Sequence, residues 1–142
     1  MQAEESVDRV RSIWEEVWNR GRLEAVDDIL TDDYVGHIPA MPAPVRGRDG
    51  FKQLIAAYRT AYPDVNVTVE DMIVGRDRVV VRWTSHGTNT GEFMGMPATG
   101  RSVEVDGISI FRIRDARVAE EWEGFDTLAM MQQLGVVDEL AA

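Results

Sequence analysis

The sequence predicts an α+β fold in which helices pack on the concave face of a cone-shaped, curved antiparallel or mixed sheet and enclose a cavity. Two observations carry this prediction. Before Pro63 the apolar residues recur at helical spacing, and after Pro63 they alternate with polar residues at the period of a strand. Helices that precede a run of strands are typical of an α+β architecture, and a cavity between the two layers is where a small ligand would bind.

Three helices are expected in the first half of the chain. The first covers residues 7–18, whose apolar residues follow helical spacing, and Gly21 provides its stop signal. A short second helix fits residues 23–30. The prolines and glycines of the next segment, TDDYVGHIPAMPAPVRGRDG, argue against a long regular element there. The third helix presents an apolar face over residues 51–62 and ends at Pro63.

The second half is predicted to form antiparallel strands joined by tight turns. Alternation begins at Val65, and a turn at residues 75–77 leads into a Val-rich strand, 78–86, which we expect to be buried on both faces. The segment TNTGEFMGMPATG then breaks the pattern. The remaining expected elements are the strands 101–113 and 117–125, the turn 114–116 between them, and a short helix, TLAMMQQL, that begins at an Asp126 N-cap and ends at Gly135.

The composition indicates a single domain, 1–142. A chain of 142 residues, 44% hydrophobic and 28% charged, can build one core. Lys+Arg 15 against Asp+Glu 25 leave a net charge of −10, which argues against nucleic acid or an anionic membrane as partner, because both require a basic surface. The absence of cysteine excludes disulfides and thiolate metal sites. With an acidic, polar start and no apolar run of about 18 residues, the chain is expected to be cytoplasmic.

Three glutamates surround Trp122 on the last predicted strand and are candidates for acid/base chemistry. Because residues two apart share one face of a strand, Glu121 and Glu123 point to one side, and Glu120 and Trp122 point to the other. Two interpretations of Glu121 and Glu123 stay open. They form either a solvated outer surface, where most acidic side chains lie, or a polar spot in the cavity, where burial would raise a carboxyl pKa and favour proton transfer.

The two histidines are weaker candidates. His37 lies in the Pro-rich connection and His86 at the end of the Val-rich strand, and a histidine in such a place is more often solvated than catalytic. A transition-metal site would require both histidines and a carboxylate to converge. No spacing in the sequence supports such a site, so no metal is expected.

Several motifs between residues 95 and 135 recur in one known family. They are G-x-P-A-T-G, a strand ending in F-R-I before a tight turn, a strand of type V-x-E-x-W-x-x-x-D, and a closing QQLG. The first half agrees in outline through WNRGRLE, DDYVGH and RGRDGFKQL. On these residues the chain resembles the SnoaL-like polyketide cyclases of the nuclear-transport-factor-2-like superfamily, over nearly its whole length.

The resemblance implies an enzyme that closes a polyketide ring by intramolecular aldol addition without a cofactor. The acid/base of the family is an aspartate on the last strand, and Glu123 takes its position here. A family histidine on the preceding strand falls on Ser109, whose hydroxyl cannot share a proton in the same pH range, and His37 is expected to supply an imidazole from another wall. Glu121 and Ser109 are expected to contact the substrate, and Glu121 to raise the pKa of Glu123 by like-charge repulsion.

An apolar, partly aromatic wall is expected to hold a flat, hydrophobic, polyketide-like substrate. Its candidate residues are Trp14, Tyr58, Phe93, Met94, Met96 and Phe111. The uncovered face of the sheet, together with the resemblance, predicts a homodimer formed by sheet-to-sheet packing. Two alternatives stay open: a non-catalytic small-molecule binding domain, favoured by the serine at position 109, and a hydroxylase-like or epoxide-hydrolase-like tailoring enzyme on the same fold.

Overall fold

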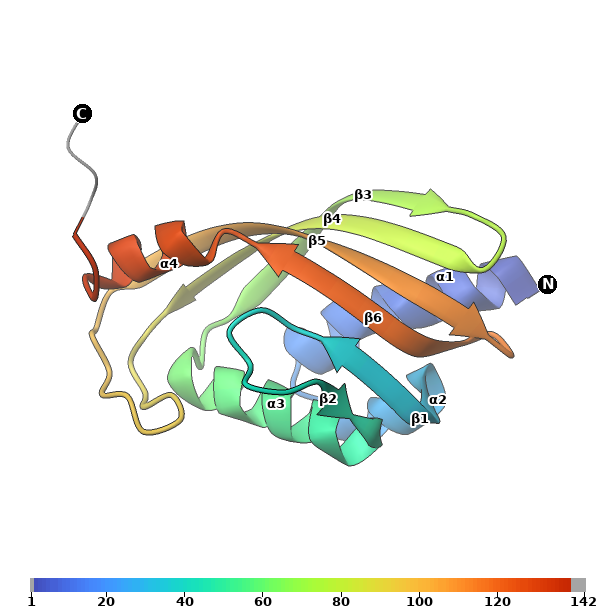
Figure 1. The fold of residues 1–142 in the computed structure, drawn as a ribbon, viewed down its shortest axis with the longest axis horizontal. Coiled ribbons are helices and arrows are strands. Elements are labelled where there is room, and N and C mark those ends of the chain that lie inside the picture. The colour runs from blue at the N-terminus through green and yellow to red at the C-terminus, as the bar shows by residue number, and fades with distance from the viewer. Residues whose placement is uncertain (1, 139–142) are drawn as a thin grey trace.

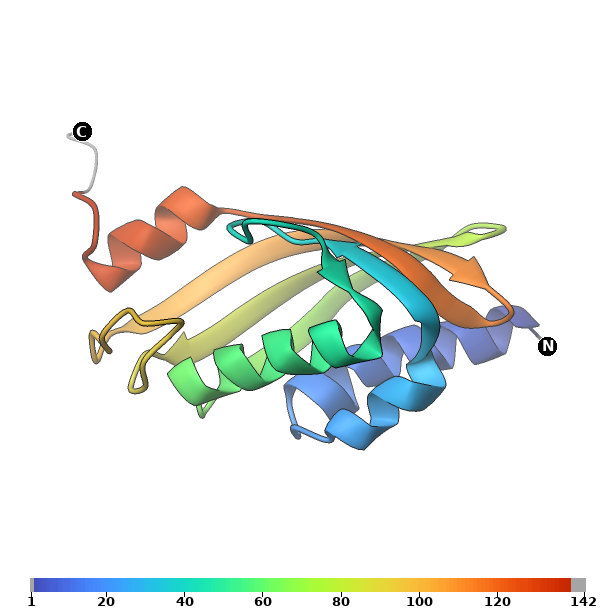
Figure 2. The ribbon, with the colours of Figure 1, turned by 60° about the horizontal axis from the view of Figure 1, so that its bottom comes forward.

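The structure is a computed structural model that describes residues 2–138. Six strands form one open, mixed sheet in the order β2-β1-β6-β5-β4-β3 (Figure 1). Figure 2 shows that this sheet is curved and that the helices of the first half lie on its concave side. The strands are β1 (Leu30–His37), β2 (Val45–Arg46), β3 (Asn66–Val74), β4 (Arg78–Thr88), β5 (Ser102–Arg114) and β6 (Arg117–Phe125). The predicted α+β architecture is confirmed.

The longer helices end close to the predicted stop signals Gly21, Pro63 and Gly135, whereas the expected helix over residues 23–30 is a 3-10 turn and one α-helical turn that end at Ile29. They are α1 (Gln2–Ser12), a π-helical turn η1 (Ile13–Trp18), a 3-10 turn η2 (Leu23–Ala25), α2 (Val26–Ile29), α3 (Gly47–Ala61) and α4 (Thr127–Leu134). In the π-helical turn, the N–H of Asn19 donates to the Trp14 carbonyl, five residues back, at 2.9 Å. The Asn19 side chain then accepts from the N–H of Val67 and donates to its carbonyl, at 2.6 and 2.9 Å, which ties the first helix to β3.

The segment after α2 is a strand, so the expected irregular connection is wrong over residues 31–37. β1 pairs in parallel with β6, placing Gly36 beside Glu121, and antiparallel with β2. The strand partner β6 lies far along the chain, and the prolines begin only at Pro39, so local composition did not reveal it. Gly36 fits the middle of this strand because a Cβ there would lie 2.3 Å from the Tyr34 hydroxyl oxygen.

β4 is buried on one face only, although the sequence suggested burial on both. Val79, Val81 and Trp83 are buried on the concave side, whereas Arg82 between them is exposed. The helices cover a single face of the sheet, so the outer side chains of β4 stay in solvent. Within residues 2–138, no helix has both the length and the apolar character needed to cross a membrane.

The predicted C-terminal turn and helix are confirmed. The β5–β6 turn contains two residues in the left-handed region, Asp115 and Ala116, with φ of 53° and 61°. The Asp126 carboxylate accepts from the N–H of Ala129 at 2.9 Å and caps α4, which ends at Gly135 with φ of 78°. These two features fix the ends of β6, the strand that carries the candidate carboxyls.

Candidate active site

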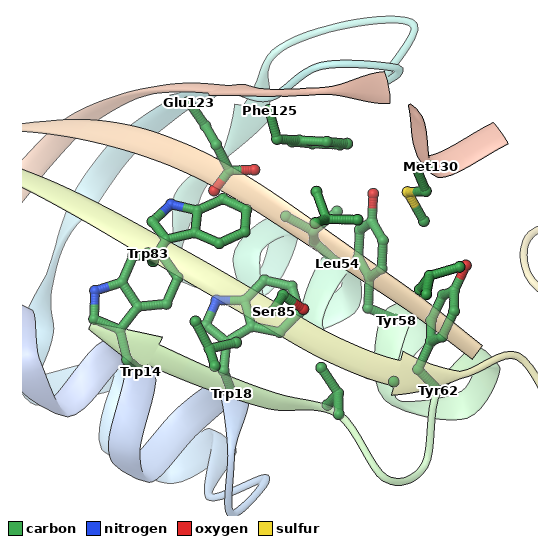
Figure 3. A pocket seen from close by; sticks show the side chains of 15 residues that line it. Trp14, Trp18, Leu54, Tyr58, Tyr62, Trp83, Ser85, Glu123, Phe125 and Met130 are labelled. Atoms are coloured by element: carbon green, nitrogen blue, oxygen red, sulfur yellow. The ribbon is translucent and has the colours of Figure 1, made fainter. Parts of the chain in front are cut away.

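A pocket lies between the concave face of the sheet and the helices α1–η1 and α3 (Figure 3). Its free volume is about 70 Å³, and apolar side chains form most of its lining. In Figure 3 the carboxyl of Glu123 points from β6 into this space, towards Trp83. The aromatic residues that line it are Trp14, Trp18, Tyr58, Tyr62, Trp83 and Phe125.

The indole of Trp83 is held in one orientation by its neighbours on β5. A Cβ at Gly107 would lie 2.2 Å from the indole, so only glycine lets the ring lie against that strand. The indole Nε1 donates to Ser109 Oγ at 3.0 Å. On its other side, the ring centroid of Trp14 is 5.6 Å away. The wall of the pocket beside Glu123 is therefore preorganised.

Two glutamates of β6 meet on the concave face. Glu123 lines the pocket, whereas Glu121 is only 2% exposed and lies outside the lining. Glu121 Oε1 accepts a hydrogen bond of 2.8 Å from the Tyr34 hydroxyl of β1. Glu123 Oε1 accepts a longer bond, 3.4 Å, from the hydroxyl of Ser109, its direct partner on β5. Both carboxyls are thus held from a neighbouring strand.

Burial raises the pKa of both carboxyls. Desolvation is the main cause for each, and repulsion from Glu121 raises the pKa of Glu123 further, well above its ordinary value of 4.5. The bond from Tyr34 lowers the pKa of Glu121, because a donor stabilises the carboxylate. Two neighbouring carboxyls in apolar surroundings do not both ionise near neutral pH, so the pair retains a proton.

The model of one protein family, described as SnoaL-like polyketide cyclase, matches residues 8–134. This chain belongs to the SnoaL-like polyketide cyclase family. Nogalonic acid methyl ester cyclase from Streptomyces nogalater is 25% identical over 119 residues, covering 83% of this chain and 89% of that protein. Aklanonic acid methyl ester cyclase DauD from Streptomyces sp. (strain C5) is 26% identical over 133 residues, covering 91% and 81%.

Solved structures of similar chains share the SnoaL-like fold. A proposed SnoaL-like polyketide cyclase from Jannaschia sp. CCS1 has a TM-score of 0.86 at 25% identity, covering 95% of this chain and 94% of that one. TsrD from Streptomyces laurentii has a TM-score of 0.82 at 31% identity, covering 93% and 96%. The family resemblance predicted from the sequence is confirmed.

His37 does not reach the pocket of this SnoaL-like chain, so the expected imidazole in the cavity is wrong. Side chains alternate along β1, and Tyr34 and Gly36 are buried while His37 lies on the outer face. Its Nε2 is 2.7 Å from Glu120 Oε2, and its ring stacks on Trp122 at 5.6 Å. Within residues 2–138, no three histidine or acidic side chains gather in a way that could hold a metal ion.

Of the expected wall residues, Trp14 and Tyr58 line the pocket and the others do not. Phe111 is fully buried in the core, with its ring 6.2 Å from Trp14. Ser109 and Glu121 are likewise buried and lie outside the lining, and Ser109 contacts the lining residues Trp83 and Glu123. Their side chains support the lining from behind.

The connection between β4 and β5 touches the pocket wall at one point. Phe93 packs on Tyr58 with ring centroids 4.7 Å apart, whereas Met94 and Met96 are 63% and 48% exposed. Phe93 and Met96 exchange backbone hydrogen bonds, and this tight turn directs both methionines into solvent. The expectation that all three side chains line the cavity is therefore wrong for this structure.

Two residues beside the candidate carboxyls were not among the site residues expected from the sequence. The Tyr34 hydroxyl on β1 donates to Glu121 on the neighbouring strand β6, but the DDYVGH segment has no pattern that predicts a strand. Trp83 stands beside Glu123 because it follows Val79 and Val81 on the buried face of β4. Strict alternation, applied to β4 in place of burial on both faces, would have placed Trp83 on the concave side.

Proposed function

We propose that this chain is a cofactor-independent polyketide cyclase that closes a ring by intramolecular aldol addition, with Glu123 as the acid/base. The observation that supports it is the Glu123 carboxyl, which keeps a raised pKa in a pocket walled by aromatic side chains. The family and the relatives named as methyl ester cyclases support the substrate class. The cytoplasmic location stays a prediction, which fractionation of the source cells would test.

In such a ring closure, an enolate carbon attacks a carbonyl carbon of the same molecule. A C–C bond forms, the carbonyl oxygen becomes an alkoxide, and a proton moves to that oxygen. A carbon between two carbonyls is already acidic, so one carboxyl of suitable pKa suffices for proton transfer. The aromatic wall contributes by holding a flexible substrate with its reacting carbons close together. Binding energy then offsets the entropic part of the activation barrier.

The size of the pocket predicts movement on binding. A free volume of about 70 Å³ is well below the roughly 300–1,000 Å³ of sites that enclose drug-sized ligands. Met130 of α4 lies at the pocket, and methionine adapts its shape readily. We therefore expect Met130, and the connection whose Phe93 packs on Tyr58, to move outward when a multi-ring substrate binds.

The test replaces each carboxyl separately and uses aklanonic acid methyl ester as substrate. Glu123→Gln keeps the shape and removes the proton transfer, so turnover should fall by roughly 10²–10⁴-fold while binding, followed by tryptophan fluorescence, persists. Glu121→Gln should reduce turnover less, because Glu121 lies outside the pocket lining. Wild-type turnover in Glu123→Gln would remove the acid/base role, and a thermal melt of each variant checks that it is folded.

Two alternatives have a specific observation behind them. The serine at position 109 favours a binding domain, and tight binding of the ester without turnover by the wild type would support it. A tailoring enzyme is favoured by AclR, a proposed hydroxylase from Streptomyces galilaeus, whose structure matches with a TM-score of 0.82 at 25% identity. Product analysis distinguishes it, since an aldol closure conserves the mass of the substrate and hydroxylation adds an oxygen.

The outer face of the sheet supports the proposed homodimer. Ile108 and Ile110 of β5 and Trp122 of β6 are 50%, 39% and 37% exposed on that face. Arg78 lies 5.8 Å above the Trp122 ring, and the exposed Arg82 is the direct partner of Ile108 on β4, so charged side chains flank these apolar ones. Packing of this surface against a second copy would bury roughly 1,200–2,000 Å² in total if it forms an interface of standard size.

A further inference from the structure

A fully buried contact behind the pocket joins β1 to the carboxyl pair. Tyr34 is 0% exposed and does not line the pocket, yet its hydroxyl donates to Glu121 Oε1 at 2.8 Å. The phenol reaches Glu121 by crossing Gly36, where a Cβ would lie 2.3 Å from the hydroxyl oxygen. β1 thus contains a residue that aims at Glu121 and a glycine that leaves room for it.

The two carboxyls are bonded unequally. Glu121 accepts the short bond from Tyr34, whereas Glu123 accepts the bond of 3.4 Å from Ser109. The Ser109 oxygen also accepts from Trp83 Nε1 at 3.0 Å, which turns its single hydrogen towards Glu123. Because short bonds to an ionised acceptor are the stronger ones, the negative charge of the pair is better stabilised on Glu121.

We propose that Tyr34 is a positioning residue that holds Glu121 as the carboxylate and so keeps the proton of the pair on Glu123. Glu123 then enters the reaction as an acid. This consequence for catalysis rests on the proposed function, whereas the position of the proton does not. A neutral Glu123 also leaves the pocket lining without a negative charge, which suits an incoming enolate.

The proton balance of the step follows from this position. The substrate loses its α-proton to solvent, the enolate carbon bonds to the carbonyl carbon, and the π electrons of that carbonyl become the alkoxide lone pair. Glu123 gives its proton to the alkoxide oxygen and regains one from solvent. The sum is an isomerisation, and above about pH 7, the pKa of Glu121, that carboxyl stays ionised throughout.

Few other ionisable groups face the pair. Tyr34 on β1 interacts with both carboxyls, and Tyr58 on α3 interacts with Glu123. Among residues 2–138, no arginine, lysine or histidine contributes to the raised or lowered pKa of either glutamate. The choice of the protonated carboxyl is therefore made by Tyr34, Ser109 and the two glutamates themselves.

The test is a ¹³C NMR titration of the glutamate carboxyls, assigned with Glu121→Gln and Glu123→Gln. In the wild type, Glu121 should ionise at lower pH than Glu123. Tyr34→Phe should raise the apparent pKa of Glu121 and lower that of Glu123, and the ratio of protonated to ionised carboxyl changes about tenfold when a pKa moves by one. Gly36→Ala should act in the same direction, because its methyl group displaces a hydroxyl that is still present.

Tyr62→Phe is the matched control, since it removes the hydroxyl of a buried tyrosine whose pKa is raised by burial alone. Both carboxyls should titrate there as in the wild type. The proposal is overturned if Glu123 ionises before Glu121 in the wild type, or if Tyr34→Phe and Gly36→Ala leave both titrations unchanged. The wild-type order decides the matter should either variant fail to fold.

Catalysis gives a second readout. If Tyr34→Phe lowers the pKa of Glu123 by about one, kcat near neutral pH should fall up to about tenfold, with KM unchanged because Tyr34 does not line the pocket. An equal loss of kcat at every pH, with the pH profile in its wild-type position, would indicate a merely structural role. Full turnover by Glu123→Gln would refute the proposed function, while the carboxyl titration would still report where the proton resides.

Discussion

Replacing Glu123 with glutamine should stabilise the folded protein at alkaline pH. The pKa of Glu123 is raised well above 4.5 on folding, so above that pH the folded state binds more protons than the unfolded chain. A raised carboxyl pKa favours folding at low pH, and the free energy of unfolding falls as the pH rises towards the folded pKa. Glutamine cannot ionise and removes this dependence.

The expected size follows from the difference between the folded and unfolded pKa. Each pH unit between these two values is worth about 1.4 kcal/mol per carboxyl. Because the folded pKa of Glu123 lies well above 4.5, the free energy of unfolding of the wild type falls with this slope as the pH rises towards the folded pKa, whereas that of Glu123→Gln does not. Glu121, whose pKa is raised from 4.5 to about 7, adds a smaller dependence of the same sign in both proteins.

Urea unfolding at several pH values measures the difference between wild type and Glu123→Gln. The two histidines and the overall net charge contribute similarly to both proteins, so they largely cancel in that difference. Glu70→Gln, an exposed position on β3, removes one negative charge without touching the pocket and should keep the wild-type slope. If the free energy of unfolding falls equally with pH in the wild type and in Glu123→Gln, Glu123 is not buried in its protonated form.

Two further outcomes concern packing and assembly. Gly107→Ala should lower the free energy of unfolding by about 1–3 kcal/mol, because the new methyl group overlaps the Trp83 indole. Gly124→Ala on the neighbouring strand, with nothing within 4 Å of the new Cβ, should change it by less than about 0.5 kcal/mol, and thermal melts compare the two. Sedimentation at micromolar concentration should give twice the monomer mass of 16.0 kDa, and a monomer would contradict the proposed dimer.

The second half of the fold was predictable from local patterns. Alternation, the turn at 114–116 and the Asp126 cap place β5, β6 and α4 within a residue or two of their observed ends. The same alternation put Glu121 and Glu123 on one face, and helices over that face make it the interior. Which face the helices cover depends on contacts between distant segments, so the sequence left the solvated interpretation open.

What could not be predicted depends on pairing across the chain. The sequence of β1 lacks a regular strand pattern because Gly36 interrupts it. Its extended conformation is stabilised by pairing with β6. The Pro-rich context of His37 predicts a loop, whereas its position in β1 turns its side chain to the outer face. The Tyr34–Glu121 bond likewise joins residues with no common motif, and only the parallel register brings them together.

From the place of β6 in the sheet, we expect its insertion to be a late step of folding. β6 lies between β1 and β5, so β1 has only the short β2 as a sheet partner until residues 117–125 have been synthesised and inserted (Figure 1). Pairings across so long a stretch of chain form late and slowly. Insertion carries Glu121 and Glu123 from water into the interior, so above about pH 4.5 this step takes up a proton from solvent. We therefore expect refolding to slow as the pH rises. The glutamate pair would acquire its proton during folding, when β6 inserts, before any substrate binds.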